Sequence, residues 1–134
     1  MLTDLPVGSD PEREEWVGAS PLAFIRLVAP TTPLDRMREI ASHGRGFVYL
    51  ISRLGVTGVQ ESTSASLPET IHRLRSATSL PICVGFGIST PAQARTVGEL
   101  ADGVVVGSAL VRAAERGPEE VLELTRSLRE ALDG

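Results

Sequence analysis

Two glycine-containing turns in the second half of the sequence carry the strongest chemical signal. Each follows a short apolar run and leads into a predicted helix, and they read Gly85-Phe86-Gly87-Ile88-Ser89 and Gly107-Ser108. Glycine lets the backbone approach a ligand closely, and a helix N-terminus offers unpaired N–H groups at the positive end of the helix dipole. Two successive units of this form favour phosphate binding, while the alternative is that these glycines only serve tight turns.

A long connection between a predicted strand and a predicted helix carries the second signal. It covers residues 52–66, roughly 15 residues, where about 2–6 are usual. Long loops in compact domains are commonly lids or binding loops. Gly55 and Gly58 are candidate hinges, and Thr57 is a candidate hydrogen-bond partner for a catalytic carboxylate or a substrate. The alternative is a surface loop without a function.

Five further residues are chemically versatile, and each also has a purely structural explanation. Tyr49 lies in a predicted strand, where a ligand role and a core role are equally open, and Asp4 is at a strand end or in a turn. Cys83 is expected to be a small core residue. His43 is expected at a helix C-terminus and His72 on a solvated helix face. The sequence has no metal-ligand spacing and suggests no Ser-His-Asp or Cys-His set.

Short β-branched runs alternate with turns and amphipathic helices, a pattern that indicates a parallel sheet. The spacing of Ser66 and Glu69, and of Thr90 and Gln93, predicts a capping box at the start of two helices. Thr32 is predicted to cap another helix. The predicted strands are apolar on both faces and lie at 24–28, 47–51, 81–85 and 103–106. The predicted helices lie at 11–17, 33–43, 67–78, from 91 onwards, at 107–116 and from 118 onwards, the last with a stripe of Val121, Leu124, Thr125, Leu128 and Leu132.

Composition narrows the class of protein. The chain has 134 residues, 42% hydrophobic and 22% charged, with a net charge of −4, which is typical of one soluble domain. The negative net charge argues against nucleic-acid and anionic-membrane partners. The single cysteine excludes an internal disulfide. No apolar run has the length of a membrane span and the N-terminus does not resemble a signal peptide, so a cytoplasmic location is expected. A complete (β/α)₈ barrel needs about 200 residues or more, so a whole barrel is excluded.

Four segments, taken in their order and at their spacing, resemble the tryptophan synthase α chain family. They are Leu27-Val28-Ala29-Pro30-Thr31-Thr32-Pro33, residues 46–58, Gly85-Phe86-Gly87-Ile88-Ser89 and Gly107-Ser108-Ala109. The resemblance covers nearly the whole chain. It implies an α/β fold, the C-terminal half of a TIM (β/α)₈ barrel with about four parallel βα units. Residues 1–134 would form a single partial domain, with 1–23 as the end of strand four and its loop and helix, and 24–134 as units five to eight.

The resemblance also implies an activity, a partner and a set of site residues. The family is a lyase that cleaves indole-3-glycerol phosphate to indole and glyceraldehyde 3-phosphate in tryptophan biosynthesis. Its partner is the tryptophan synthase β chain, in an α₂β₂ type of complex, where pyridoxal phosphate belongs to the β chain and no cofactor to this one. Carried over by position, the implied residues are Gly58, Phe86, Gly87, Gly107 and Ser108 for the substrate phosphate, Leu27 and Tyr49 for the indole pocket, Arg53, Gly55 and Thr57 for the mobile loop, and Asp4 for the partner interface.

The catalytic glutamate and aspartate of the family have no counterpart in this sequence, because they belong to the earlier half of the barrel. Cleavage of the C–C bond needs an acid for the indole ring and a base for the indole nitrogen or a glycerol hydroxyl. Glu61, Glu69 and Asp102 are not expected at strand ends facing a substrate. The chain alone is therefore predicted to be inactive. The alternatives are a non-catalytic half-barrel that binds phosphosugars or indole compounds, and a module that docks on the β chain.

The predicted half-barrel has a physical consequence for its assembly. Four parallel strands cut from a barrel leave two sheet edges with unpaired N–H and C=O groups, and one exposed inner face. Either two copies close the barrel, or the half-barrel aggregates or stays partly molten. A homodimer is expected if the chain is stable in solution.

Overall fold

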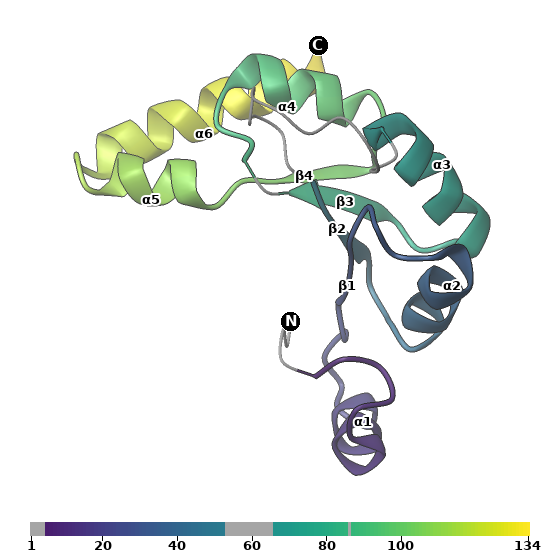
Figure 1. Cartoon of the computed structure of the whole chain (residues 1–134). Coiled ribbons are helices and arrows are strands. Elements are labelled where there is room, and N and C mark those ends of the chain that lie inside the picture. Colours follow the sequence, from purple (N-terminus) through teal and green to yellow (C-terminus); the bar gives the residue numbers. More distant parts are fainter. Residues whose placement is uncertain (1–4, 53–65, 86) are drawn as a thin grey trace.

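The computed structural model describes residues 5–52, 66–85 and 87–134, which form one parallel four-stranded sheet with helices against one face (Figure 1). The strand order is β1-β2-β3-β4, so each strand lies beside the next one in the sequence. A helix joins each strand to the next, as the alternating pattern predicts. The strands are β1 (Arg26–Val28), β2 (Val48–Ile51), β3 (Ile82–Gly85) and β4 (Gly103–Val105), and the helices are α1 (Pro11–Gly18), α2 (Leu34–Ser42), α3 (Leu67–Ala77), α4 (Pro91–Gly98), α5 (Ser108–Ala114) and α6 (Pro118–Asp133).

The hydrophobic core lies between the sheet and the helices α2, α3 and α4. Alternate strand residues point into it, because successive side chains of a strand point to opposite faces. The fully buried strand residues are Val28, Val48, Leu50, Ile82 and Val84. The side chains on the opposite face of the sheet are only partly buried. Cys83 lies on this face, whereas the sequence predicts it to be a core residue. Cys83 is only partly buried and lies outside the hydrophobic core, since none of the helices within the described ranges covers its face of the sheet.

Local capping signals decide where the helices begin. The capping boxes of Ser66 with Glu69 and of Thr90 with Gln93 are both present, as predicted. The predicted cap at Thr32 is wrong. Helix α2 has Pro33 as its N-cap with no side-chain hydrogen bond, and the Thr32 hydroxyl instead accepts from the Ala29 N–H at 3.1 Å. The Thr32 N–H donates to the Ala29 carbonyl at 3.0 Å, so Thr32 belongs to the turn that follows β1.

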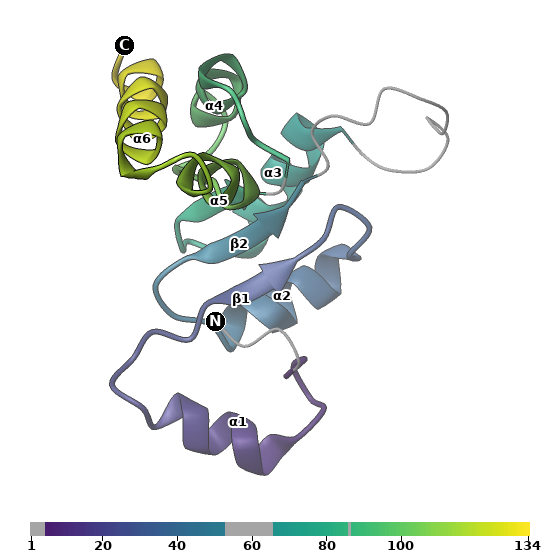
Figure 2. The same ribbon diagram turned by 90° about the vertical axis from the view of Figure 1, so that its left-hand side faces the viewer.

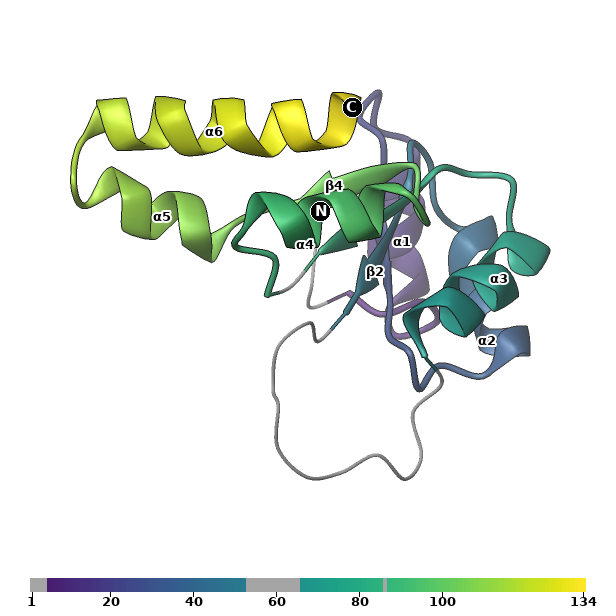
Figure 3. The same ribbon diagram turned by 90° about the horizontal axis from the view of Figure 1, so that it is seen from above.

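Helix α6 packs against α4 and α5 at one end of the sheet, and α5 and α6 project beyond β4 (Figure 3). Gly98 permits close contact with α6, because a Cβ there would collide with Leu132. The apolar stripe of α6 faces inward as predicted except at Thr125, which is exposed and donates its hydroxyl to the Val121 carbonyl at 2.7 Å. None of the helices in the described ranges has the length and apolarity needed to cross a membrane.

Helix α1 stands apart from the sheet, next to β1 (Figure 2). It has no buried residue, so apolar packing contributes little to its position. Arginine side chains from the rest of the chain hold it and the segment before it. Arg45 donates to the carbonyls of Gly18, Ser20 and Leu22, and Arg36 to that of Val7.

Candidate functional site

The two glycine turns lie at the same edge of the sheet. Gly85 pairs with Val105 at the carboxyl ends of the parallel strands β3 and β4. Gly87 and Gly107 each come two residues after this pair, so the two turns leave the sheet at matching positions. Gly87 has a φ of 84°, a left-handed conformation that glycine adopts without strain. The structure therefore gathers the two predicted turns at the carboxyl edge, where ligands of parallel α/β proteins bind.

The helix N-termini behind the two turns differ in how their N–H groups are satisfied. At α4, the Gln93 side-chain oxygen accepts from the N–H groups of Ser89 and Thr90, at 2.9 and 3.2 Å. The Thr90 hydroxyl accepts from the Gln93 N–H at 3.3 Å. At α5, Gly107 is the N-cap and makes no side-chain hydrogen bond. The capping box thus occupies backbone donors at α4, whereas no side chain caps the first turn of α5.

Gly107 also leaves room for a ligand. A Cβ placed on it would have no atom within 4 Å, and both Gly107 and Ser108 are exposed. The φ of Gly107 is −117°, so the backbone does not require glycine there. Open space beside an uncapped helix start is the arrangement that suits an anion.

Leu27 and Tyr49 are neighbours on the uncovered face of the sheet. They are directly paired in the register of β1 with β2, and both are partly buried. The Tyr49 ring leans across Gly85, because a Cβ there would lie 2.8 Å from the Tyr49 Cζ atom and 2.9 Å from the Val105 Cβ atom. Gly85 is two positions nearer the carboxyl edge than the strand partner of Tyr49, which is Cys83. The tyrosine therefore extends along the sheet towards the two glycine turns.

Glu69 and Asp102, which the sequence predicts to lie away from strand ends that face a substrate, both lie away from the two glycine turns. Glu69 serves the capping box of α3 and is exposed. Asp102 precedes β4, at the amino-terminal edge of the sheet, and accepts from the Ile82 N–H at 2.8 Å. It also pairs with Arg75 at 3.1 Å. These two donors hold the pKa of the Asp102 carboxyl below its ordinary value. Glu61 lies outside the described residues.

The thiol on the uncovered face has a raised pKa. Burial raises the pKa of Cys83, and the negative charge of Asp102 adds to the effect. A protonated thiol is a weak nucleophile, so Cys83 is not suited to covalent catalysis. His43 is the C-cap of α2 and His72 is exposed on α3, both as predicted. Among the residues that the structure describes, no three His, Cys, Asp or Glu side chains gather as a metal site.

Several site predictions lie outside the described residues: Asp4, Arg53, Gly55, Thr57, Gly58 and Phe86. The strand that leads to residues 53–65 is well anchored. Ser52 is buried, and its N–H donates to the Gly85 carbonyl at 2.8 Å. Ser52 therefore lies beside the carboxyl end of β3.

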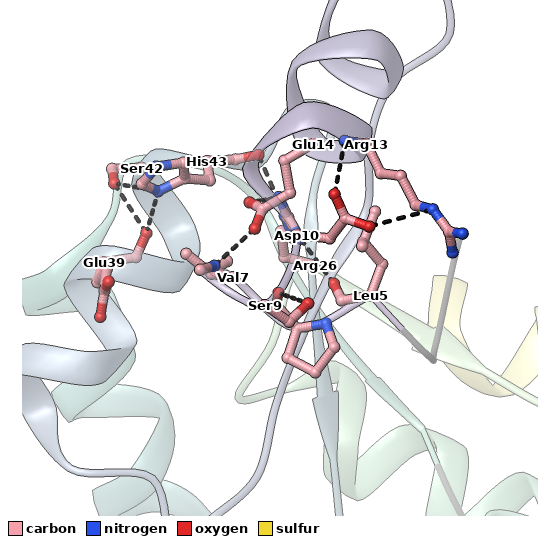
Figure 4. Close-up of polar contacts among 12 residues, drawn as sticks. Leu5, Val7, Ser9, Asp10, Arg13, Glu14, Arg26, Glu39, Ser42 and His43 are labelled. Carbon is pink, nitrogen blue, oxygen red and sulfur yellow. Dashed lines mark hydrogen bonds and ion pairs between the residues drawn. The ribbon is translucent and has the colours of Figure 1, made fainter.

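One buried charged residue was missed by sequence reasoning. Arg26 is the first residue of β1 and the middle residue of the apolar run 24–28, and it is 4% exposed. It donates to the Leu5 carbonyl, the His43 carbonyl and the Glu14 carboxylate (Figure 4). A charged residue in the middle of an apolar strand is the signal that would have identified it, since arginine is almost never fully buried unless paired.

Comparisons with known proteins agree on one family. The family model described as tryptophan synthase alpha chain matches residues 1–132. The chain is 44% identical over 140 residues to the tryptophan synthase alpha chain of Desulfatibacillum aliphaticivorans, covering 100% of this chain and 53% of the relative. It is 48% identical over 111 residues to that of Opitutus terrae, covering 83% of this chain and 42% of the relative.

Solved structures show the same likeness. Tryptophan synthase from M. tuberculosis in its aminoacrylate-bound form matches with a TM-score of 0.81 and 31% identity, covering 96% of this chain and 48% of that one. The tryptophan synthase alpha chain from Legionella pneumophila matches with a TM-score of 0.79 and 34% identity, covering 98% and 50%. The chain thus spans about half the length of the relatives it matches. Its four parallel strands with their helices correspond to half of a TIM barrel.

Proposed function

Because the chain belongs to the tryptophan synthase alpha chain family, we propose that it supplies the phosphate-binding half of a site for indole-3-glycerol phosphate. The reaction is cleavage of this substrate to indole and glyceraldehyde 3-phosphate in tryptophan biosynthesis. One observation carries the proposal. Gly87 and Gly107 lie at matching positions beyond the paired ends of β3 and β4, and no side chain caps the first turn of α5.

The described residues divide into two parts of the proposed site. Gly87, Gly107 and Ser108 bind the phosphate, with backbone N–H groups and the serine hydroxyl as donors. Leu27 and Tyr49 bind the indole ring, since they form a partly buried row on the uncovered face of the sheet. Outside the described residues, the resemblance assigns Gly58 and Phe86 to the phosphate, Arg53, Gly55 and Thr57 to a mobile loop, and Asp4 to the partner interface.

The chemical step needs groups beyond this half-site. An acid protonates the indole ring, the bond between the ring and the glycerol carbon breaks, and a base takes the proton from the indole nitrogen or a glycerol hydroxyl. Glu69 and Asp102 do not serve, because one caps α3 and the other lies at the opposite edge of the sheet. The chain alone is therefore expected to bind the phosphate end of the substrate without releasing indole.

The proposed partner is the tryptophan synthase β chain, which receives the indole and carries pyridoxal phosphate. On this proposal the chain itself uses no cofactor and works in the cytoplasm. The second candidate is a half-barrel that binds phosphosugars without a role in catalysis, and the exposed N-terminus of α5 favours it equally. The third candidate is a module that only docks on the β chain, for which no phosphate binding is expected.

Calorimetry with glycerol 3-phosphate tests the phosphate site. Gly107→Val places a side chain in the open space before α5, where a Cβ meets no atom within 4 Å, so the fold should tolerate it. We expect binding to the wild-type chain and about tenfold weaker binding to this variant, the loss equivalent to one good hydrogen bond to a charged group. Gly18→Ala is the control, because Gly18 is equally open but lies at the end of α1.

Two results would contradict the proposal. Absence of binding to the wild-type chain would leave only the docking module. Equal binding by Gly107→Val would place the phosphate elsewhere. An indole-release assay of the chain alone completes the test, since turnover would show that acid and base are present after all.

A further inference from the structure

We propose that Arg73 is a positioning residue, which holds the turn of residues 29–32 in place as one wall of the site for the indole ring. The inference rests on the proposed function, which places that ring beside Leu27 and Tyr49. Arg73 belongs to α3, and none of the sequence motifs includes it. It acts through the Thr32 carbonyl, to which its Nη2 donates at 2.8 Å, a distance typical of a hydrogen bond from a charged group.

The turn after β1 is closed by hydrogen bonds within itself. The Thr32 N–H donates to the Ala29 carbonyl at 3.0 Å, and the Ala29 N–H donates to the Thr32 hydroxyl at 3.1 Å. Pro30 is the second residue of this turn, where its fixed φ is favourable. The turn can therefore form without Arg73. What the hydrogen bond from Arg73 adds is the position of the turn relative to α3.

Helix α3 is a firm anchor for this contact. Its start is fixed by the capping box of Ser66 with Glu69, and Ile71 and Leu74 are buried in the core. It packs against α2, the helix into which the turn leads (Figure 3). Helix α2 has no side-chain cap at its own start. Arg73 thus ties the turn before α2 to a neighbouring helix that is fixed independently.

The turn lies at the level of the sheet that the Tyr49 ring reaches. The alternating burial along β1 continues to Ala29, which is half-buried like Leu27 and points to the same uncovered face. The register of β1 with β2, and of β2 with β3, puts Ala29 at the level of Gly85. The Tyr49 ring leans across Gly85. An indole ring beside Leu27 and Tyr49 therefore meets the turn on the side of the carboxyl edge.

A wall that is in place before the ring arrives favours binding. Ordering a loop around a ligand costs conformational entropy, which reduces the affinity. With Arg73 the turn is already ordered when the ring binds. The phosphate end of the site should not depend on Arg73, because Gly107 follows β4, and β4 and β1 are at opposite ends of the strand order.

The test compares two substitutions of Arg73 with a control on the same helix. Arg73→Met keeps an unbranched side chain and removes every donor, whereas Arg73→Lys keeps a charged donor and should restore part of the effect. Arg75→Met is the control, because Arg75 pairs with Asp102 at the amino-terminal edge of the sheet. It removes an ion pair of α3 without touching the turn.

Two NMR measurements on the folded chain separate positioning from stability. Hydrogen exchange of the Thr32 amide reports on the turn, and titration with indole, followed by the amide shifts of Leu27 and Tyr49, reports on the ring site. We expect about tenfold faster exchange and about tenfold weaker indole binding in Arg73→Met, each equivalent to one lost hydrogen bond to a charged group. Arg73→Lys should lie between this variant and wild type, and Arg75→Met should match wild type. Glycerol 3-phosphate should bind equally to all four chains.

The contrary outcomes are distinct. Wild-type exchange at Thr32 in Arg73→Met would show that Arg73 does not hold the turn. Faster exchange with wild-type indole affinity would show that the turn is no wall of the ring site. An equal loss of indole binding in Arg75→Met, or a parallel loss of glycerol 3-phosphate binding in Arg73→Met, would assign the effect to general stability. Absence of indole binding to the wild-type chain would overturn the inference, while glycerol 3-phosphate binding to that chain reports separately on the proposed phosphate site.

Discussion

Single residues on the uncovered face of the sheet show how the candidate site is shaped. Tyr49 lies across Gly85, and any side chain at Gly85 would displace it, since a Cβ there would come within 2.8 Å of the ring. Gly103 has the same relation to Cys83, whose Sγ would lie 2.8 Å from a Cβ. These glycines therefore serve close packing on the sheet. Of the glycines in the two turns at the carboxyl edge, Gly87 is the one with a positive φ, which the backbone of its turn favours in glycine.

Asp102 should make the stability of the chain depend on pH. Its folded-state pKa lies below the ordinary value of about 3.9, because the Ile82 N–H and Arg75 stabilise the carboxylate. A lowered pKa stabilises the fold above the unfolded pKa, and this contribution is lost as the pH falls through the folded pKa. We expect Asp102→Asn to be less stable than wild type in urea unfolding at pH 7, and the difference to shrink as the pH falls below about 4 and to be lost only below the folded-state pKa.

The matched control for this prediction is Asp35→Asn. Asp35 pairs with Arg38 in the first turn of α2, and its side chain is 95% exposed. A surface pair of this kind contributes little. A stability difference for Asp102→Asn that persists unchanged at pH 3 would show that the carboxylate charge is not its cause.

At the scale of elements, the starts of α4 and α5 differ in their local hydrogen bonds. The capping box of α4 uses Thr90 and Gln93 to satisfy three backbone N–H groups next to the glycine turn. Helix α5 follows an equivalent turn with no side-chain cap. Two βα units that look alike in sequence therefore offer different numbers of free donors to a ligand.

Loss of the α4 cap should be measurable as a loss of stability. Thr90→Ala removes the hydroxyl that accepts from the Gln93 N–H, and we expect a decrease of about 1 kcal/mol in the free energy of unfolding. Thr125→Ala is the control, because Thr125 is exposed within α6 and caps nothing, so the change should be neutral or slightly stabilising. An equal change in the free energy of unfolding for the two substitutions would show that the Thr90 cap does not stabilise the fold.

At the scale of the whole molecule, the sheet has two open edges. Among the described strands, β1 and β4 each have a neighbour on one side only. The large apolar side chains that the described part of the chain exposes belong to elements flanking these edges, with Trp16 and Leu22 before β1 and Val111 and Leu122 after β4. Trp16 and Leu22 line a cavity of about 500 Å³ together with Phe24. The relatives are about twice as long as this chain.

We expect the purified chain to form a homodimer in which β4 of one copy lies beside β1 of the other. Trp16 is the single tryptophan and is 79% exposed, so its fluorescence should shift to shorter wavelength as dimers form with rising concentration. Leu22→Glu should weaken the dimer in sedimentation, whereas His72→Glu, on the exposed face of α3, should not. A wild-type chain that stays monomeric and unfolds cooperatively would contradict this assembly.

Most of the fold could be predicted from the sequence, because its signals act over a few residues. Short β-branched runs indicated the strands, and Ser66 with Glu69 or Thr90 with Gln93 set helix starts through hydrogen bonds between near neighbours. The glycine turns likewise follow from the residue types within each turn. Thr32 is the exception, since a competing turn with Ala29 engages its hydroxyl.

The sequence by itself determined the parallel βα order, the family and the glycine turns at the ends of β3 and β4. Only the tertiary structure decided that Cys83 lies on the uncovered face, that Tyr49 reaches across Gly85, and that Arg26 donates to the Leu5 carbonyl about twenty positions away. The physical reason is the range of the interactions. Caps and turns depend on neighbours within four residues, whereas a buried guanidinium is defined by partners that only folding brings together.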